Sequence, residues 1–307
     1  MCKIPITTFY SQFQGHPIDN ISKLHTSLKS QGCKEFIFLA GDSSLDNKHW
    51  LFKTNNKTRE LSVLRSKMNI SPAINGFQNI MDPPFMIKDI SYWLNHLAEK
   101  KYGPNKINTI MTAVEASTLQ DRELDLLPQD KFIRDNITSN DTLIVSIGGN
   151  DVALRPSIQT MINIKLLTSC PDWLIENYYA PGFSHFVNLF HNKIEAYVKQ
   201  LCSIHKPKKI VICMIYYLDK QDGDSWADNL LHSLGYTENP EKLQLIIRTL
   251  YEYISKKGYN IEGVDVTTLP LFKILDGNNT NDYIQRVEPS ITGGKKIATS
   301  FTDIVFS

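Results

Sequence analysis

The chain has 307 residues, of which 42% are hydrophobic and 21% are charged, and its net charge is +1. This composition supports a sizeable folded core and excludes a disordered chain, while the small net charge excludes a general attraction to nucleic acid or to an anionic membrane. No apolar run reaches the roughly 18 residues of a membrane-spanning helix, and the N-terminal segment lacks the apolar stretch of a secretory leader.

The cysteines are scattered, odd in number and without a CxxC pair: Cys2, Cys33, Cys170, Cys202 and Cys213. This usage is typical of reduced thiols in a cytosol and not of a disulfide framework or a zinc site. The acidic residues show no ligand-spacing signature either. We therefore expect a cytoplasmic protein with no metal and no other cofactor.

Short apolar segments alternate with helical stretches along the chain. Strands are predicted at 36–40, 107–114, 142–147, 209–216 and 264–269, and helices at 87–100, 183–205, 240–257 and 293–302. This alternation is typical of a mainly parallel sheet with helices on both faces, an α/β three-layer sandwich. No change in composition divides the chain, so we expect a single domain over residues 1–307 with a loop-rich insertion at 52–106.

The first predicted strand runs directly into Gly41-Asp42-Ser43. A serine in this position is presented on a turn at the edge of the sheet, where the amides of the following chain favour negative charge. Taken alone, the motif is more often a turn or a helix N-cap than a catalytic serine.

The strand at 142–147 opens into Gly148-Gly149-Asn150-Asp151. Asn150 offers a neutral amide donor of the kind that an oxyanion hole needs. A plain glycine-rich turn and a nucleotide-binding loop are the alternatives. The nucleotide motifs GxGxxG and GxxxxGK[ST] are both absent, which argues against the second.

Near the C-terminus, a proline-containing loop with Glu288 precedes the last predicted helix. In this order the three motifs resemble those of the GDSL or SGNH hydrolase family, from about residue 35 to the C-terminus. The resemblance implies a flavodoxin-like sandwich, Ser43 as nucleophile and Asn150 as oxyanion donor. It also implies a second donor at a family glycine, whose place falls at Ala116. An alanine amide can donate there if its φ is negative. A second alignment places the glycine at Asn75-Gly76.

The chain departs from the family at its last motif, where Asp-x-x-His is replaced by Gln285-x-x-Glu288. A free glutamate is about two pKa units less basic than a histidine, but burial could raise the pKa of Glu288 enough for it to act as the base. The alternative for Glu288 is a structural ion pair with Arg286. His49, six residues after Ser43, is the other candidate base.

Two functions from different classes follow. The first is a serine esterase or deacylase that acts on a small-molecule or acylated substrate through an acyl-Ser43 intermediate. The second is a catalytically impaired relative of these hydrolases that acts as a binding or scaffold module. Trp226 is a candidate to roof the pocket in either case. Cys213, Tyr216 and Tyr217 close a strand whose end should face the same crevice, but core packing is the favoured role for them.

Overall fold

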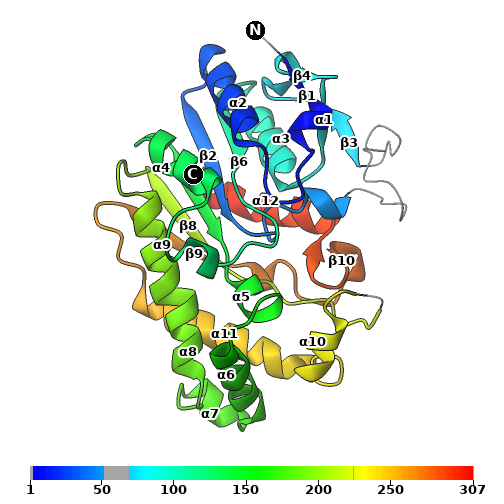
Figure 1. Cartoon of the computed structure of the whole chain (residues 1–307), viewed down its shortest axis with the longest axis vertical. Coiled ribbons are helices and arrows are strands. Elements are labelled where there is room, and N and C mark those ends of the chain that lie inside the picture. The colour runs from blue at the N-terminus through cyan, green and yellow to red at the C-terminus, as the bar shows by residue number, and fades with distance from the viewer. Residues whose placement is uncertain (1–2, 52–68, 224, 307) are drawn as a thin grey trace.

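The computed structural model describes residues 3–51, 69–223 and 225–306. Its centre is a five-stranded parallel sheet with the strand order β6-β2-β7-β8-β9 (Figure 1). The strands are β2 (Glu35–Gly41), β6 (Ile107–Met111), β7 (Thr142–Ser146), β8 (Lys209–Met214) and β9 (Asp265–Pro270). All five predicted strands are confirmed, with ends that differ by a few residues.

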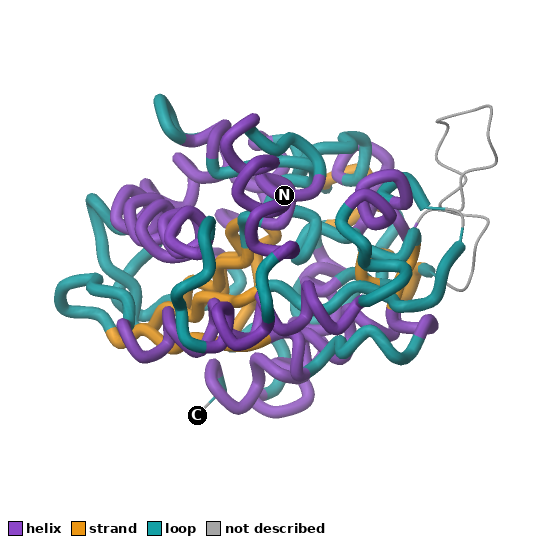
Figure 2. The backbone as a smooth tube through the Cα atoms, turned by 90° about the horizontal axis from the view of Figure 1, so that it is seen from below, coloured by secondary structure: helices purple, strands orange, loops and turns teal. Residues whose placement is uncertain are grey.

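The sheet is covered on both faces, because its strand residues alternate between two cores. Phe36, Phe38 and Ala40 belong to one hydrophobic cluster, whereas Ile37 and Leu39 belong to the other. Figure 2 shows the strands between layers of helices on either side. The predicted three-layer α/β sandwich is therefore confirmed.

One face carries α3 (Ile90–Tyr102) and α12 (Ile291–Val305), which pack against each other. The other face carries α2 (Ile18–Ser30), α4 (Pro128–Asn136), α9 (Ile194–Leu201) and α11 (Pro240–Lys257). The helix predicted at 183–205 is one continuous helical stretch in which the π-helical η5 (Asn188–Lys193) separates α8 (Phe183–Val187) from α9.

Several of the described helices were not predicted. They are α2 and α4 on the sheet, and α1 (Ile6–Phe9), α5 (Gly149–Ala153), α6 (Ile158–Ser169), α7 (Asp172–Glu176) and α10 (Asp228–Ser233). Together with α8 and α11, helices α6, α7 and α10 form the lower part of the molecule in Figure 1, below the sheet. This helical part provides much of the wall of the cavity described below.

Three two-stranded ribbons complete the fold. The pairs are β1 (Ile4–Pro5) with β4 (Met81–Asp82), β3 (Ile70–Pro72) with β5 (Phe85–Ile87), and β10 (Tyr283–Ile284) with β11 (Glu288–Pro289). Of the insertion expected at 52–106, residues 52–68 lie outside the described residues. The remainder contains α3, which forms the crossover between β2 and β6 and so covers the sheet.

None of the helices in the described ranges has the length and hydropathy needed to cross a bilayer. The described cysteines are free thiols: Cys33, Cys170, Cys202 and Cys213. Cys2 lies outside the described residues.

Candidate active site

The site lies where β2 and β7 end side by side. β6, the next strand of this sheet along the chain, pairs with β2 on one side, and β7, β8 and β9 follow on the other side. This is the flavodoxin-like order, in which a crevice opens at the carboxyl ends of the two strands where the direction reverses. Ser43 follows β2 and Asn150 follows β7, so the sheet brings both residues to this crevice.

A close approach of the two strand ends makes glycine necessary at position 41. Gly41 pairs with Ser146 and has a φ of 137°, and a Cβ on Gly41 would lie 1.7 Å from the carbonyl oxygen of Ser146. Any side chain here would push β2 and β7 apart. The glycine of the Gly-Asp-Ser motif is thus explained by packing.

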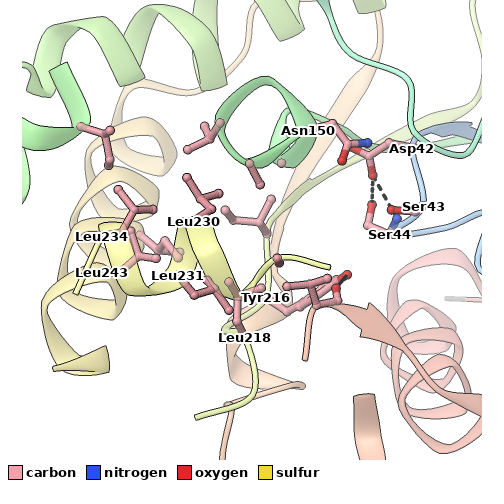
Figure 3. A pocket seen from close by; sticks show the side chains of 18 of the residues that line it. Asp42, Ser43, Ser44, Asn150, Tyr216, Leu218, Leu230, Leu231, Leu234 and Leu243 are labelled. Carbon is pink, nitrogen blue, oxygen red and sulfur yellow. Dashed lines mark hydrogen bonds between the residues drawn. The ribbon is translucent and has the colours of Figure 1, made fainter. Parts of the chain in front are cut away.

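The turn that presents Ser43 is held by its neighbours. The Asp42 carboxylate accepts hydrogen bonds from the backbone N–H and the hydroxyl of Ser44, at 3.0 and 2.7 Å (Figure 3). The hydroxyls of Ser44 and Ser146 are 2.6 Å apart, which links this turn to the end of β7. Asp42 and Ser44 therefore fix the turn and leave Ser43 to face the cavity.

Three of the predicted site residues line one cavity of about 120 Å³: Ser43, Asn150 and Glu288. They come from the turn after β2, from α5 and from β11. Ala116 and His49 are not among the residues that line it. Ser43 and Asn150 lie at the same end of the cavity in Figure 3.

Glu288 is buried, with 3% of its surface exposed, and its carboxylate adjoins the Ser43 hydroxyl. Burial raises the pKa of Glu288 to about 8, although the interaction with Ser43 opposes the shift. Asn47 fixes the position of Glu288: its side-chain amide donates to the carbonyl of Pro289 at 3.0 Å and accepts from the N–H of Ile90 at 3.2 Å. The strand that carries Glu288 is thus anchored to the chain segment that carries Ser43.

The alternative of an ion pair between Arg286 and Glu288 is wrong. Arg286 is buried and binds Asp222 and Asp228 through Nη1, at 3.0 and 2.9 Å. Gln285, the other substituted position of the family motif, accepts a hydrogen bond from the N–H of Trp226 at 3.1 Å. Arg286 and Gln285 therefore hold the loop before β11 and leave the Glu288 carboxylate to Ser43.

Sequence reasoning missed a second buried carboxyl group, Glu115. It is 2% exposed, its backbone N–H donates to Asp46 at 3.0 Å, and its carboxylate accepts from Trp50 Nε1 at 3.2 Å. Burial raises the pKa of Glu115 well above its usual range, and the negative charge of Glu288 raises it further. Glu288 therefore ionises first, near pH 8, while Glu115 keeps its proton. The only feature of the sequence that pointed to Glu115 was its position directly before Ala116.

Ala116 has a φ of 59°, so the condition for donation by its amide, a negative φ, is not met. That left-handed conformation favours glycine. Within the described ranges no acceptor pairs with the backbone N–H of Ala116 or of Ser43. Asn150 uses one amide hydrogen on the carbonyl of Ser117, at 3.0 Å, and retains a second.

The second alignment, Asn75-Gly76, is wrong. The Asn75 side chain donates to the carbonyl of Ile107 at 2.7 Å. Ile107 is the first residue of β6, so this turn lies at the amino ends of the strands, opposite to Ser43.

His49 lies on the 3-10 helix η1 (Lys48–Leu51). Its ring meets Phe13 and Trp50 edge to face, with centroids 4.4 and 5.2 Å away. Trp50 is the donor to Glu115, and His49 is not among the residues that line the cavity. Its role as a base is a prediction with less geometric support than that of Glu288.

Two aromatic residues complete the cavity wall, Tyr216 and Trp226. The Tyr216 hydroxyl donates to the carbonyl of Val287 at 2.7 Å, which supports the strand that carries Glu288. Tyr217 stacks on Phe272, and Cys213 belongs to the core beneath the sheet. The pocket role expected for Trp226 is therefore confirmed, and Tyr217 and Cys213 have the packing role.

Residues 3–51, 69–223 and 225–306 contain no cluster of His, Cys, Asp and Glu that could hold a metal ion.

No family model and no curated protein sequence matches the chain. Its fold is similar to several solved structures. An acetylxylan esterase from Geobacillus stearothermophilus is 12% identical with a TM-score of 0.44, over 89% of this chain and 95% of the other. A putative GDSL-like lipase from Parabacteroides merdae is 14% identical with a TM-score of 0.45, over 89% and 96%. A carbohydrate acetylesterase from Sinorhizobium meliloti is 12% identical with a TM-score of 0.41, over 89% and 99%.

These neighbours are esterases and lipases at low identity. In this chain the strand order places the three motifs at one crevice, in the arrangement that their resemblance to the GDSL or SGNH hydrolases implies. In fold and in the order of its motifs, the chain is similar to the SGNH hydrolases.

Proposed function

We propose that the protein is a carboxylic-ester hydrolase, a divergent relative of the SGNH hydrolases, in which Ser43 is the nucleophile and Glu288 is the base. The observation that carries the proposal is the placement of the buried Glu288 carboxylate against the Ser43 hydroxyl, in a cavity that Asn150 also lines. Nucleophile, base and oxyanion donor are the minimum set for acyl transfer.

In the first step, Ser43 Oγ attacks the acyl carbon while its proton passes to Glu288. The carbonyl oxygen becomes an oxyanion, for which the second amide hydrogen of Asn150 and the N–H group of Ser43 are the donors at hand. Collapse of this intermediate breaks the bond to the alcohol, and protonated Glu288 gives its proton to the departing oxygen. Acyl-Ser43 and the free alcohol result.

In the second step, water attacks acyl-Ser43 and gives its proton to Glu288. The new oxyanion collapses, Ser43 Oγ leaves and takes the proton back, and a carboxylic acid is released. Glu288 therefore accepts and returns one proton in each half of the cycle.

The buried carboxyl pair makes a glutamate adequate as a base. A carboxylate with a pKa of about 8 accepts a proton at least as readily as a free imidazole, whose pKa is about 6.5. Glu115 supports this role because its neutral form keeps a second negative charge away from Glu288. The lower basicity of a free glutamate is thereby offset.

Labelling with a fluorophosphonate tests the proposal without knowledge of the substrate. We expect the reagent to modify Ser43 in the native protein, and we expect Ser43→Ala and Glu288→Gln to remain unlabelled while their melting temperatures stay within a few degrees of the native one. Heat-denatured protein is the control for unspecific reaction. A native protein that neither reacts at Ser43 nor cleaves any short-chain ester would be the binding or scaffold module instead.

A further inference from the structure

The cavity next to Ser43 has a polar end and an apolar body. In Figure 3 the labelled polar side chains, Asp42, Ser43, Ser44 and Asn150, lie together at one end, and the labelled leucines extend away from them. Side chains in the apolar body include Phe186, Phe190, Leu231, Leu243, Ile246 and Leu250. The cavity thus leads away from the nucleophile into hydrocarbon surroundings.

The walls of the apolar body are formed mainly by helices and not by the strands of the sheet. Helices α6, α8, α10 and α11 contribute to it, together with η5. Its side chains are well buried: Phe186 and Leu231 are 1% exposed and Leu250 is 2% exposed. Such a surface is held in place by packing and is available before any ligand arrives.

Charge is confined to the end of the cavity at Ser43. The charged residues that line it are Asp42 and Glu288, which both adjoin the serine. A sugar hydroxyl placed in the apolar body would lose its hydrogen bonds to water and find no replacement. A hydrocarbon chain would lose only its unfavourable contact with water.

We propose that this cavity binds the unbranched hydrocarbon chain of the acyl group that is transferred to Ser43. This proposal rests on the proposed function and adds the substrate class, an ester of a medium- or long-chain fatty acid. The acyl chain is the better occupant than an alcohol chain, because the acyl group stays attached while the alcohol must leave. Water must then reach the same carbon beside Glu288.

The position of each wall residue along the cavity predicts how far a larger side chain there would shorten the cavity. In Figure 3, Leu231 lies between the Ser43 end and Leu243, which lies farther away. A larger side chain at position 231 therefore shortens the cavity more than one at position 243. Leu243 is half-buried, so Leu243→Trp perturbs the fold less than Leu231→Trp at a fully buried position.

Binding is measured first, on the Ser43→Ala variant, by calorimetric titration with acetate, butanoate, octanoate and dodecanoate. We expect affinity to rise about fourfold for each added methylene until the cavity is full, since each contributes the usual increment for burial of hydrocarbon. Leu231→Trp should remove most of the affinity that acids longer than butanoate gain from their added methylenes. Leu243→Trp should remove only the higher affinity of dodecanoate over octanoate. Ser233→Trp is the matched control, because Ser233 is an exposed residue of the same helix as Leu231. Equal affinity for acetate and dodecanoate overturns the proposal.

Turnover is measured second, with two series of esters. One series has a constant alcohol and a growing acyl chain, and the other is made of acetates with a growing alcohol chain. We expect kcat/KM to rise along the first series and to stay within about threefold along the second. A rise along the second series alone overturns the assignment to the acyl group. Chain-length-dependent binding to a protein whose Ser43 cannot be labelled supports the cavity and overturns only the proposed hydrolase function.

Discussion

At the scale of single residues, the two buried carboxyl groups have different tasks although they are chemically identical. Glu288 adjoins the Ser43 hydroxyl, and Glu115 accepts a hydrogen bond from Trp50. A glutamine mimics a protonated carboxyl group but accepts no proton. We therefore expect Glu288→Gln to lower kcat/KM by about 10²–10⁴, the usual contribution of a general base, and Glu115→Gln to lower it by less than tenfold. Equal losses in the two variants, measured on one activated ester, would contradict this division.

The oxyanion donor gives a second prediction. Replacement of Asn150 by alanine removes its side-chain amide, and we expect kcat to fall by about 10²–10³, the usual cost of one lost donor. KM should change little, because the donor acts mainly on the charge that develops in the transition state. A loss seen only in KM would assign Asn150 to substrate binding instead.

At the scale of elements, a buried ion pair ties the turn after β2 to the loop after β6. Asp46 and Lys48 are fully buried and 2.8 Å apart, and Asp46 also accepts from the N–H groups of Gly15 and Glu115. Asp46→Ala leaves the Lys48 charge unpaired, so we expect a loss of about 3–5 kcal/mol in the free energy of unfolding. The double variant Asp46→Ala with Lys48→Met should lose less than the sum of the two single variants. Additive losses in urea unfolding would show that the pair is not coupled.

Most of the elements that position the site could be predicted because their signals are local. Apolar runs marked the five strands, and the motif residues stood at the ends of two of them. Helix α6 was missed because apolar residues occupy several sides of it: Ile164 lines the cavity, whereas Ile158 and Ile162 are exposed. The proximity of Glu115 and Glu288 depends on the packing of segments more than 170 residues apart in sequence. No spacing rule could reveal it.

At the scale of the whole molecule, buried carboxyl groups make stability depend on pH. Burial raises the pKa of Asp42 to about 6, of Asp89 to about 7 and of Glu288 to about 8. A group whose pKa is raised on folding stabilises the folded state below its unfolded pKa, and this contribution is lost as the pH rises through the folded pKa. The buried histidines His16 and His25 have the opposite effect on stability, because burial lowers their pKa to about 4. Their contribution to the free energy of unfolding rises with pH and becomes constant above about pH 6.5, the ordinary pKa of histidine.

We therefore expect the free energy of unfolding to decrease between about pH 6.5 and pH 8.5. The slope is about 1.4 kcal/mol per pH unit for each proton that the folded state retains and the unfolded state has lost. Thermal melts across this range measure it, and Glu288→Gln should flatten the upper part of the curve. A melting temperature that stays constant or rises over this range would show that the buried carboxyl groups are already ionised.

The pH dependence of Ser43 labelling by a fluorophosphonate tests most directly whether a carboxylate activates this serine. Because Glu288 must be ionised to accept the proton, and burial raises its pKa to about 8, the rate of labelling should rise with pH and level off only above about pH 8. The variant Glu288→His should move this midpoint down toward about 6.5, the ordinary value of an imidazole. A native rate with its midpoint near 6.5, or one that Glu288→Gln leaves unchanged, would contradict the assignment of Glu288 as the base.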